Sequence, residues 1–113
     1  MSYKQMVITK FGPPEVLKMV EKEHIPEPQT GEVRVKVLVT SACFTDTLLR
    51  KGKYPEVRQK PPFPPGYDMV GVVDAVGAGV SSVEIGQRVA ALTVFGAYSE
   101  YMCLAQVRHQ FLP

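Results

Sequence analysis

The stretch that decides the fold is Phe63–Gly77, FPPGYDMVGVVDAVG. Its opening Pro64–Gly66 predicts a rigid turn, because the proline rings fix φ and glycine adopts conformations closed to other residues. The mostly apolar run Val70–Val76 then predicts a strand buried on both faces. A glycine inside a strand normally weakens it, so at Gly71 we expect close approach of another backbone or a ligand.

Apolar and polar residues alternate on both sides of this stretch, which is typical of half-buried strands. Valines should share one face of a strand at positions 33, 35, 37 and 39. The other strands that we expect are Tyr3–Thr9 paired with Val16–Val20, and a hairpin of Arg88–Val94 with Ala97–Leu104 around Phe95-Gly96.

Only Thr45–Lys51 suits a helix. Thr45 can cap its start, and Gly52 can end it in a left-handed conformation. Ten prolines and nine glycines leave little room for other long helices. The sequence therefore predicts a mainly β fold, an antiparallel β-barrel with one or two short helices.

Length and composition limit what the chain can be. Its 113 residues allow one domain, and a net charge of +2 with scattered basic residues does not indicate a nucleic-acid partner. No apolar run reaches the ~18 residues of a membrane span, and the N-terminus lacks the apolar stretch of a signal peptide. We expect Cys43 and Cys103 to be reduced thiols of a cytoplasmic protein.

Three segments together carry a family resemblance: 41–55 (SACFTDTLLRKGKYP), 63–89 and 96–101 (GAYSEY). In order and spacing they resemble the catalytic domain of the medium-chain dehydrogenase/reductase superfamily, a co-chaperonin-like barrel, and most closely its quinone oxidoreductase-like branch. The resemblance implies that residues 1–113 are the substrate-side domain without the family's C-terminal nucleotide-binding domain. It also implies an NADP- or NAD-dependent reductase acting on quinones, enones or other carbonyls, and a chain that is inactive alone.

The same resemblance bears on zinc. Zinc-dependent members bind the metal through a Cys and a His in these segments, and here Cys43 and Tyr67 occupy those positions. A phenol with a pKa near ~10 is a poor zinc ligand at neutral pH. The structural-zinc lobe with four cysteines is replaced by residues 94–98, which contain no cysteine. We expect no zinc, and His24, His109 and Cys103 have no recognisable metal-ligand spacing.

Five residues are the candidate site. By resemblance, Cys43, Phe44 and Thr47 would line the nicotinamide, and Tyr54 would line the substrate pocket. Tyr67 would donate a hydrogen bond to a substrate carbonyl as negative charge develops there. A purely structural interpretation stays open for each of them, since Cys43 and Phe44 can pack in the core, Tyr54 can anchor a loop and Tyr67 can cap the core. Many quinone oxidoreductase-like sequences carry Asn at position 43 and Tyr at position 48, which leaves the substrate class open.

Three other interpretations compete with this one. Gly77–Ser82 begins like a dinucleotide-binding fingerprint, but it lacks the third glycine and predicts a turn. Arg58–Pro65 fits a proline-rich SH3 ligand. A co-chaperonin-like or other non-enzymatic barrel is the main alternative function, although the long polar mobile loop of co-chaperonins is missing. The final stretch 110–113 (QFLP) ends on apolar residues, so we expect an apolar docking face for the missing domain and self-association or a homodimer through it.

Overall fold

The computed structural model describes residues 1–105 and the strand 109–111, and it is built mainly of antiparallel strands. Its strands are β1 (Tyr3–Ile8), β2 (Leu17–Lys22), β3 (Glu32–Thr40), β4 (Asp68–Val76), β5 (Arg88–Leu92), β6 (Tyr101–Ala105) and β7 (His109–Phe111). Its helices are α1 (Phe44–Lys51) and a single 3-10 turn at Pro14–Val16. The expected mainly β, antiparallel class with one or two short helices is confirmed.

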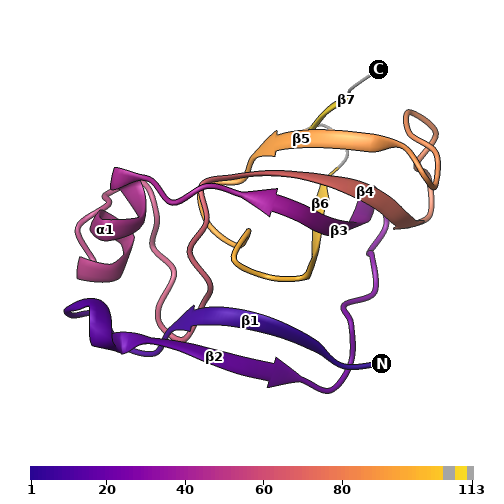
Figure 1. The fold of residues 1–113 in the computed structure, drawn as a ribbon. Coiled ribbons are helices and arrows are strands. Elements are labelled where there is room, and N and C mark those ends of the chain that lie inside the picture. Colours follow the sequence, from indigo (N-terminus) through magenta and orange to yellow (C-terminus); the bar gives the residue numbers. More distant parts are fainter. Residues whose placement is uncertain (106–108, 112–113) are drawn as a thin grey trace.

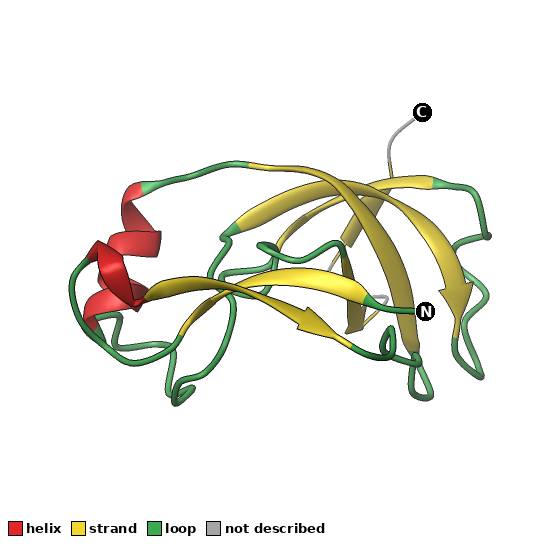
Figure 2. Ribbon diagram, turned by 60° about the horizontal axis from the view of Figure 1, so that its bottom comes forward, coloured by secondary structure: helices red, strands yellow, loops and turns green. Residues whose placement is uncertain are grey.

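The strands form two sheets. β1 and β2 pair alone, and the larger sheet has the order β6-β3-β4-β5-β7. Figure 1 shows the two sheets on opposite sides of the molecule, with α1 at one end between them. Figure 2 shows the strong curvature of the larger sheet. The small sheet is tied to the rest by backbone hydrogen bonds from Met6 N to Tyr98 O (2.9 Å) and from Glu100 N to Lys4 O (3.0 Å).

Two apolar clusters occupy the interior. The larger is formed by inward-facing residues of β3, β4 and β5, among them Val35, Val73 and Val89, none of which is exposed. The smaller joins the N-terminal hairpin to α1 through Ile8, Val16, Leu49 and Phe63. The second cluster therefore fixes α1 against the small sheet, while the first fixes the three central strands. The first cluster is the burial that a period-two pattern predicts, whereas the second combines residues of a strand, α1 and the connecting segments.

Gly71 lies where β3 and β4 approach closely. A Cβ at this position would collide with the Val35 side chain and with the carbonyl oxygen of Lys36. The expected close approach is therefore that of a neighbouring strand rather than a ligand. Since β3 and β4 pair through Val37 and Gly71, the glycine sets how tightly the two central strands can pack.

The alternation of β3 breaks before its end. Val33 and Val35 are buried, but Val39 is 63% exposed, so the expectation that the four valines share one face is wrong for Val39. The pairing of β3 with β4 shifts register between Val37 and Val39, and Leu38 is exposed there as well, at 52%. The expected burial of β4 on both faces is also wrong, since only alternate residues are fully buried and Val76 is 37% exposed.

The hairpin expected around Phe95-Gly96 does not form. β5 pairs with β4 and β7, whereas β6 pairs with β3. The connecting segment 93–100 instead hydrogen-bonds to the turn at Pro64–Tyr67, as Gly96 N donates to Pro64 O and Tyr98 N to Pro65 O, both at 2.9 Å. β5 and β6 therefore pair with different strands. The segment between them supports the turn that precedes β4.

Candidate functional site at the α1 end of the sheet

α1 begins one residue earlier than expected. Its N-cap is Cys43 rather than Thr45, which is the second residue of the helix. Asp46 takes the capping role from the third helical position, because its Oδ2 accepts a hydrogen bond from Cys43 N at 3.0 Å. At the other end, Gly52 adopts the expected left-handed conformation with φ of 71°. The predicted role of Gly52 at the end of α1 is therefore confirmed, and the predicted role of Thr45 as the N-cap is wrong.

The carboxylate of Asp46 joins three segments of the chain. Besides Cys43 N, its Oδ2 accepts a hydrogen bond from the Tyr98 phenol at 2.9 Å. Its Oδ1 accepts one from Gly66 N at 3.2 Å. Burial, followed by the hydrogen bond and the negative charge of Asp46, raises the pKa of Tyr98. Sequence reasoning gave Asp46 only a capping role, because its contact with Tyr98 spans 52 positions and leaves no local pattern.

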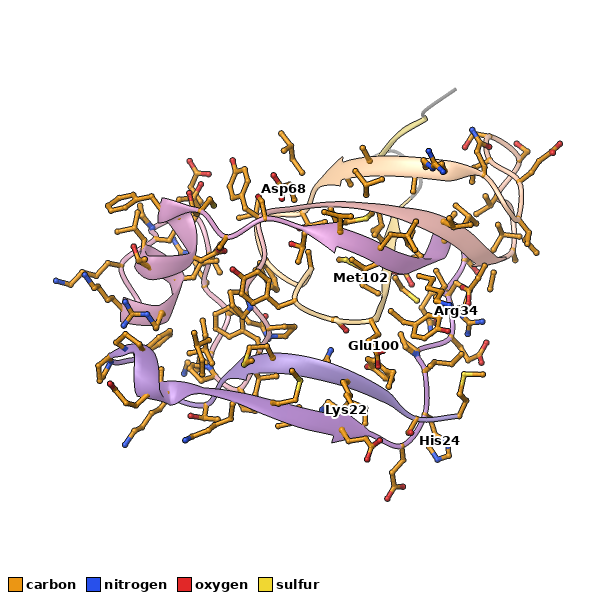
Figure 3. The ribbon with its side chains drawn as sticks, in the orientation of Figure 1. Lys22, His24, Arg34, Asp68, Glu100 and Met102 are labelled. Atoms are coloured by element: carbon orange, nitrogen blue, oxygen red, sulfur yellow. The ribbon has the colours of Figure 1, made fainter. Side chains whose placement is uncertain are left out.

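A second acidic side chain connects the end of β3 to the start of β4. Asp68 Oδ1 accepts hydrogen bonds from Ser41 Oγ (2.7 Å) and Ser41 N (3.2 Å), and Thr40 Oγ1 donates to the Asp68 carbonyl at 2.7 Å. Figure 3 labels Asp68 at the end of the larger sheet that lies next to α1, and Arg34 at the opposite end. These bonds hold the end of β3 against Asp68. The separate Asp46 contact holds the start of α1 against Gly66.

Beside this contact lies a hollow of about 570 Å³, a volume typical of small-molecule sites. Its lining combines the Ser41 and Asp68 polar groups with apolar side chains from three strand ends. The lining residues are Val39, Thr40, Ser41, Asp68, Met69, Val70, Ala90, Ala91 and Leu92. None of the five residues singled out in the sequence lines this hollow. The residues that do line it escaped the sequence analysis because they come together only through the pairing of β3, β4 and β5.

Tyr54 and Tyr67 are brought together by the fold. Burial, the charge of Glu56 and the neighbouring Tyr67 phenol, which hydrogen-bonds to it, raise the pKa of Tyr54. Tyr54 also packs against the smaller core cluster, so anchoring of its loop is part of its role. Tyr67 lies directly before β4, and its carbonyl accepts hydrogen bonds from Thr93 N (2.6 Å) and Val94 N (2.9 Å). The two phenols thus form a half-buried pair on a firmly held backbone.

The three residues assigned to the nicotinamide lie around the start of α1. Phe44 is 75% exposed, so it does not pack in the core. Cys43 is half-buried and carries a free thiol. Thr47 is half-buried, and its hydroxyl donates a 2.6 Å hydrogen bond to the carbonyl of Phe44 in the turn above. An exposed aromatic ring at a helix start is available for contact with a ligand or another domain.

The donors of the expected metal position do not fit zinc. Tyr67 offers a phenol already engaged with Tyr54, and among the residues that the structure describes no three His, Cys, Asp or Glu side chains converge on one point. His109 lies outside the described side chains. Cys103 is also free, and burial raises the pKa of its thiol to about 11, which keeps it protonated at neutral pH. In the described part of the chain, no helix has the length and apolar character that crossing a membrane requires.

Known proteins resemble this chain over nearly all of its length. A quinone oxidoreductase of Sus scrofa is 38% identical over 109 residues, which cover 94% of this chain and 32% of that protein. The synaptic vesicle membrane protein VAT-1 homolog-like of Homo sapiens is 35% identical over 98 residues, 87% of this chain and 23% of that protein. The chain thus spans about a quarter to a third of the length of these relatives.

Solved structures agree with the sequences. The crystal structure of the human VAT-1 homolog-like protein matches with a TM-score of 0.92 and 32% identity, covering 100% of this chain and 36% of that one. Escherichia coli quinone oxidoreductase complexed with NADPH matches with a TM-score of 0.88 and 30% identity, covering 97% and 33%. The family model described as the alcohol dehydrogenase GroES-like domain matches residues 29–112. The chain therefore belongs to the alcohol dehydrogenase GroES-like domain family of the medium-chain dehydrogenase/reductase superfamily.

Proposed function

We propose that this chain is the substrate-side domain of a zinc-independent, NADP- or NAD-dependent reductase of quinones, enones or other carbonyl compounds. The observation that carries the proposal is the contact of the Tyr54 and Tyr67 phenols, because the resemblance puts Tyr67 where zinc-dependent members have a histidine ligand. The similarity to several proteins named quinone oxidoreductase, one of them complexed with NADPH, supports it.

The residues present fit a nicotinamide ring. The hollow has apolar walls from strand ends and a polar edge at Thr40 and Ser41, whose hydroxyl oxygens can still accept hydrogen bonds after donating to Asp68. A flat, largely apolar ring with one amide group needs such a lining. Phe44, Cys43 and Thr47 would form the adjoining wall at the start of α1. When bound, the cofactor supplies a hydride.

The chain's own contribution is orientation and polarity. Tyr67 donates a hydrogen bond to the substrate carbonyl oxygen as negative charge develops on it, and Tyr54 donates to the Tyr67 oxygen. Hydrogen bonds in such a chain polarise one another, so the Tyr54 bond strengthens Tyr67 as a donor. The shape of the loop that carries Tyr54 would select the substrate. No step in this scheme needs a metal ion.

The rest of the proposal concerns the whole protein. Tight cofactor binding belongs to a nucleotide-binding domain outside residues 1–113, so these residues alone neither bind NADPH tightly nor turn over. We place the protein in the cytoplasm, in line with its two free cysteines. The exposed strand ends beside the hollow are the docking face for that domain, and in its absence they promote association of two copies.

The test is NADPH oxidation with a soluble quinone, measured on the full-length protein and on residues 1–113 in parallel. The full-length protein should oxidise NADPH and contain no stoichiometric zinc by metal analysis. The isolated chain should show no NADPH oxidation. Turnover by the isolated chain, or one bound zinc per subunit with activity lost to a chelator, contradicts the proposal. Assembly of the chain into rings in a sedimentation experiment would favour the co-chaperonin-like alternative.

A further inference from the structure

The first turn of α1 and the turn before β4 meet at one carboxylate. Asp46 Oδ2 accepts from Cys43 N at 3.0 Å, within the helix start. Asp46 Oδ1 accepts from Gly66 N at 3.2 Å, across to the other turn. Cys43 and Phe44 stand on one side of this link, and Tyr67 follows Gly66 on the other. The separation of the two halves of the candidate site therefore depends on where this side chain sits.

The turn on the far side of the link is rigid. Gly66 has φ of 119°, and a Cβ there would stand 2.6 Å from Tyr98 N and 2.7 Å from Ala97 N. The same stretch holds the turn by donating from Gly96 N to Pro64 O and from Tyr98 N to Pro65 O. The turn and segment 96–98 thus behave as one unit, and Asp46 links that unit to the start of α1.

Tyr98 braces that connection. Its phenol donates to Asp46 Oδ2 at 2.9 Å, while its backbone carbonyl accepts from Met6 N in β1 at 2.9 Å. Asp46 is only half-buried, so a carboxylate with fewer donors could rotate toward water. Because burial and the Asp46 charge raise the pKa of Tyr98, the phenol stays a neutral donor at every pH at which proteins normally work.

We propose that Asp46 and Tyr98 form a positioning pair, which sets the first turn of α1 at a fixed distance from Tyr67 and thereby aligns the cofactor side of the site with its substrate side. Neither residue is catalytic. The inference rests on the proposed function for its consequence in turnover, but its geometric content concerns this chain alone. It assigns to Asp46 a role beyond capping α1, and to the half-buried Tyr98 a role in supporting Asp46.

The decisive measurement is amide hydrogen exchange of Cys43 and Gly66, followed by NMR on the chain and its Tyr98→Phe variant. These two amides donate to Asp46, so both should exchange at least about tenfold faster when the brace is lost. The matched control is Tyr3→Phe, which removes a phenol from a buried tyrosine near the start of β1. It should leave both exchange rates unchanged.

Kinetics on the full-length protein then separate positioning from plain stability. Tyr98→Phe and Asp46→Asn should each lower kcat roughly 10- to 100-fold with KM for NADPH little changed, because alignment rather than binding is lost. The kcat of the double variant should be no lower than that of the less active single variant, since the two residues act as a unit. The control for Asp46→Asn is Asp74→Asn, which breaks the 2.8 Å pair with Arg34 at the far end of the sheet.

The outcomes keep the two proposals apart. Unchanged exchange at Cys43 and Gly66 in Tyr98→Phe overturns the positioning pair, whatever the protein catalyses. The pair is also overturned if Asp74→Asn lowers kcat as much as Asp46→Asn, since the effect would then be general destabilisation. A wild-type protein that reduces no quinone contradicts the proposed function. The exchange experiment needs no turnover, so it still tests the positioning pair.

Discussion

The Tyr98 phenol donates a 2.9 Å hydrogen bond to the Asp46 carboxylate, which lies 52 positions earlier in the chain. The bond connects the start of the only α-helix in the described residues to the segment that also pairs with β1. Burial, and then Asp46 itself, raise the pKa of Tyr98 from its ordinary value of 10.0. One contact therefore affects both the geometry of the candidate site and the response of the protein to alkali.

The response to alkali can be measured. Since the pKa of Tyr98 is higher in the folded than in the unfolded chain, its contribution to stability is complete below pH ~10 and is lost as pH rises beyond that value toward the folded pKa. The free energy of unfolding from urea titrations should therefore fall above pH ~10. Tyr98→Phe should show a shallower fall, by about one proton at most. Equal slopes for Tyr98→Phe and the wild type would contradict the assignment.

Removing the Tyr67 hydroxyl tests the proposed chemistry. In the full-length protein, Tyr67→Phe should lower kcat/KM for a quinone by about 100-fold, because a donor to the developing oxyanion is lost. Tyr54→Phe should have a smaller effect, since Tyr54 acts through Tyr67. Tyr101→Phe, on β6, serves as the control and should change little. A Tyr67→Phe enzyme with full activity would leave the phenol a structural role only.

Gly71 should tolerate no side chain. Gly71→Ala puts a methyl group into the Val35 side chain and the Lys36 carbonyl, so β3 and β4 must separate, and we expect a loss of about 2 kcal/mol or more in the free energy of unfolding. Gly79→Ala is the control, because nothing lies within 4 Å of its added Cβ and only its φ of 79° opposes the change. Chemical denaturation of both variants gives the comparison. An equal loss in the two would show that packing at Gly71 is loose.

The exposed strand ends should make the chain associate. Leu92 is 68% exposed and Val39 63%, and both line the hollow at the α1 end of the sheet. Sedimentation of residues 1–113 should show reversible association at high concentration, which Leu92→Lys weakens by placing a charge in the contact. Ile85→Lys changes an equally exposed residue in the β4–β5 connection and should not weaken association. A wild-type chain that stays monomeric at millimolar concentration would contradict this prediction.

Local patterns predicted the elements well. The pairing of β1 with β2, the course of β3 and β4 and the glycine end of α1 all follow from alternation and from the special backbone freedom of glycine. The same patterns predicted a hairpin of β5 and β6 that does not exist. Alternation cannot say which neighbour a strand takes, and here β3 and β4, distant in sequence, compete successfully for these two strands.

The candidate site was predictable only in part. Tyr54 and Tyr67, which the resemblance singled out separately, lie together in the fold, and their catalytic roles stay predictions. The Ser41–Asp68 contact and the Asp46–Tyr98 bond were not foreseen, because each depends on tertiary proximity that no spacing encodes. The unusual backbone conformation of Val94 was not predicted either. Its φ of 68° is rare for a β-branched residue, and its N–H donates to the Tyr67 carbonyl.

The ties between β1 and segment 98–100 also have a consequence for biosynthesis. Lys4 and Met6 find their partners in Glu100 and Tyr98, more than 90 residues later. At ribosomal speeds of ~5–20 residues per second, the N-terminal hairpin waits on the order of 10 s before those partners emerge. In the first part of that interval Ile8 also lacks Leu49 and Phe63, which complete its cluster in the finished fold. We therefore expect the nascent hairpin to expose apolar side chains until these later segments have been made.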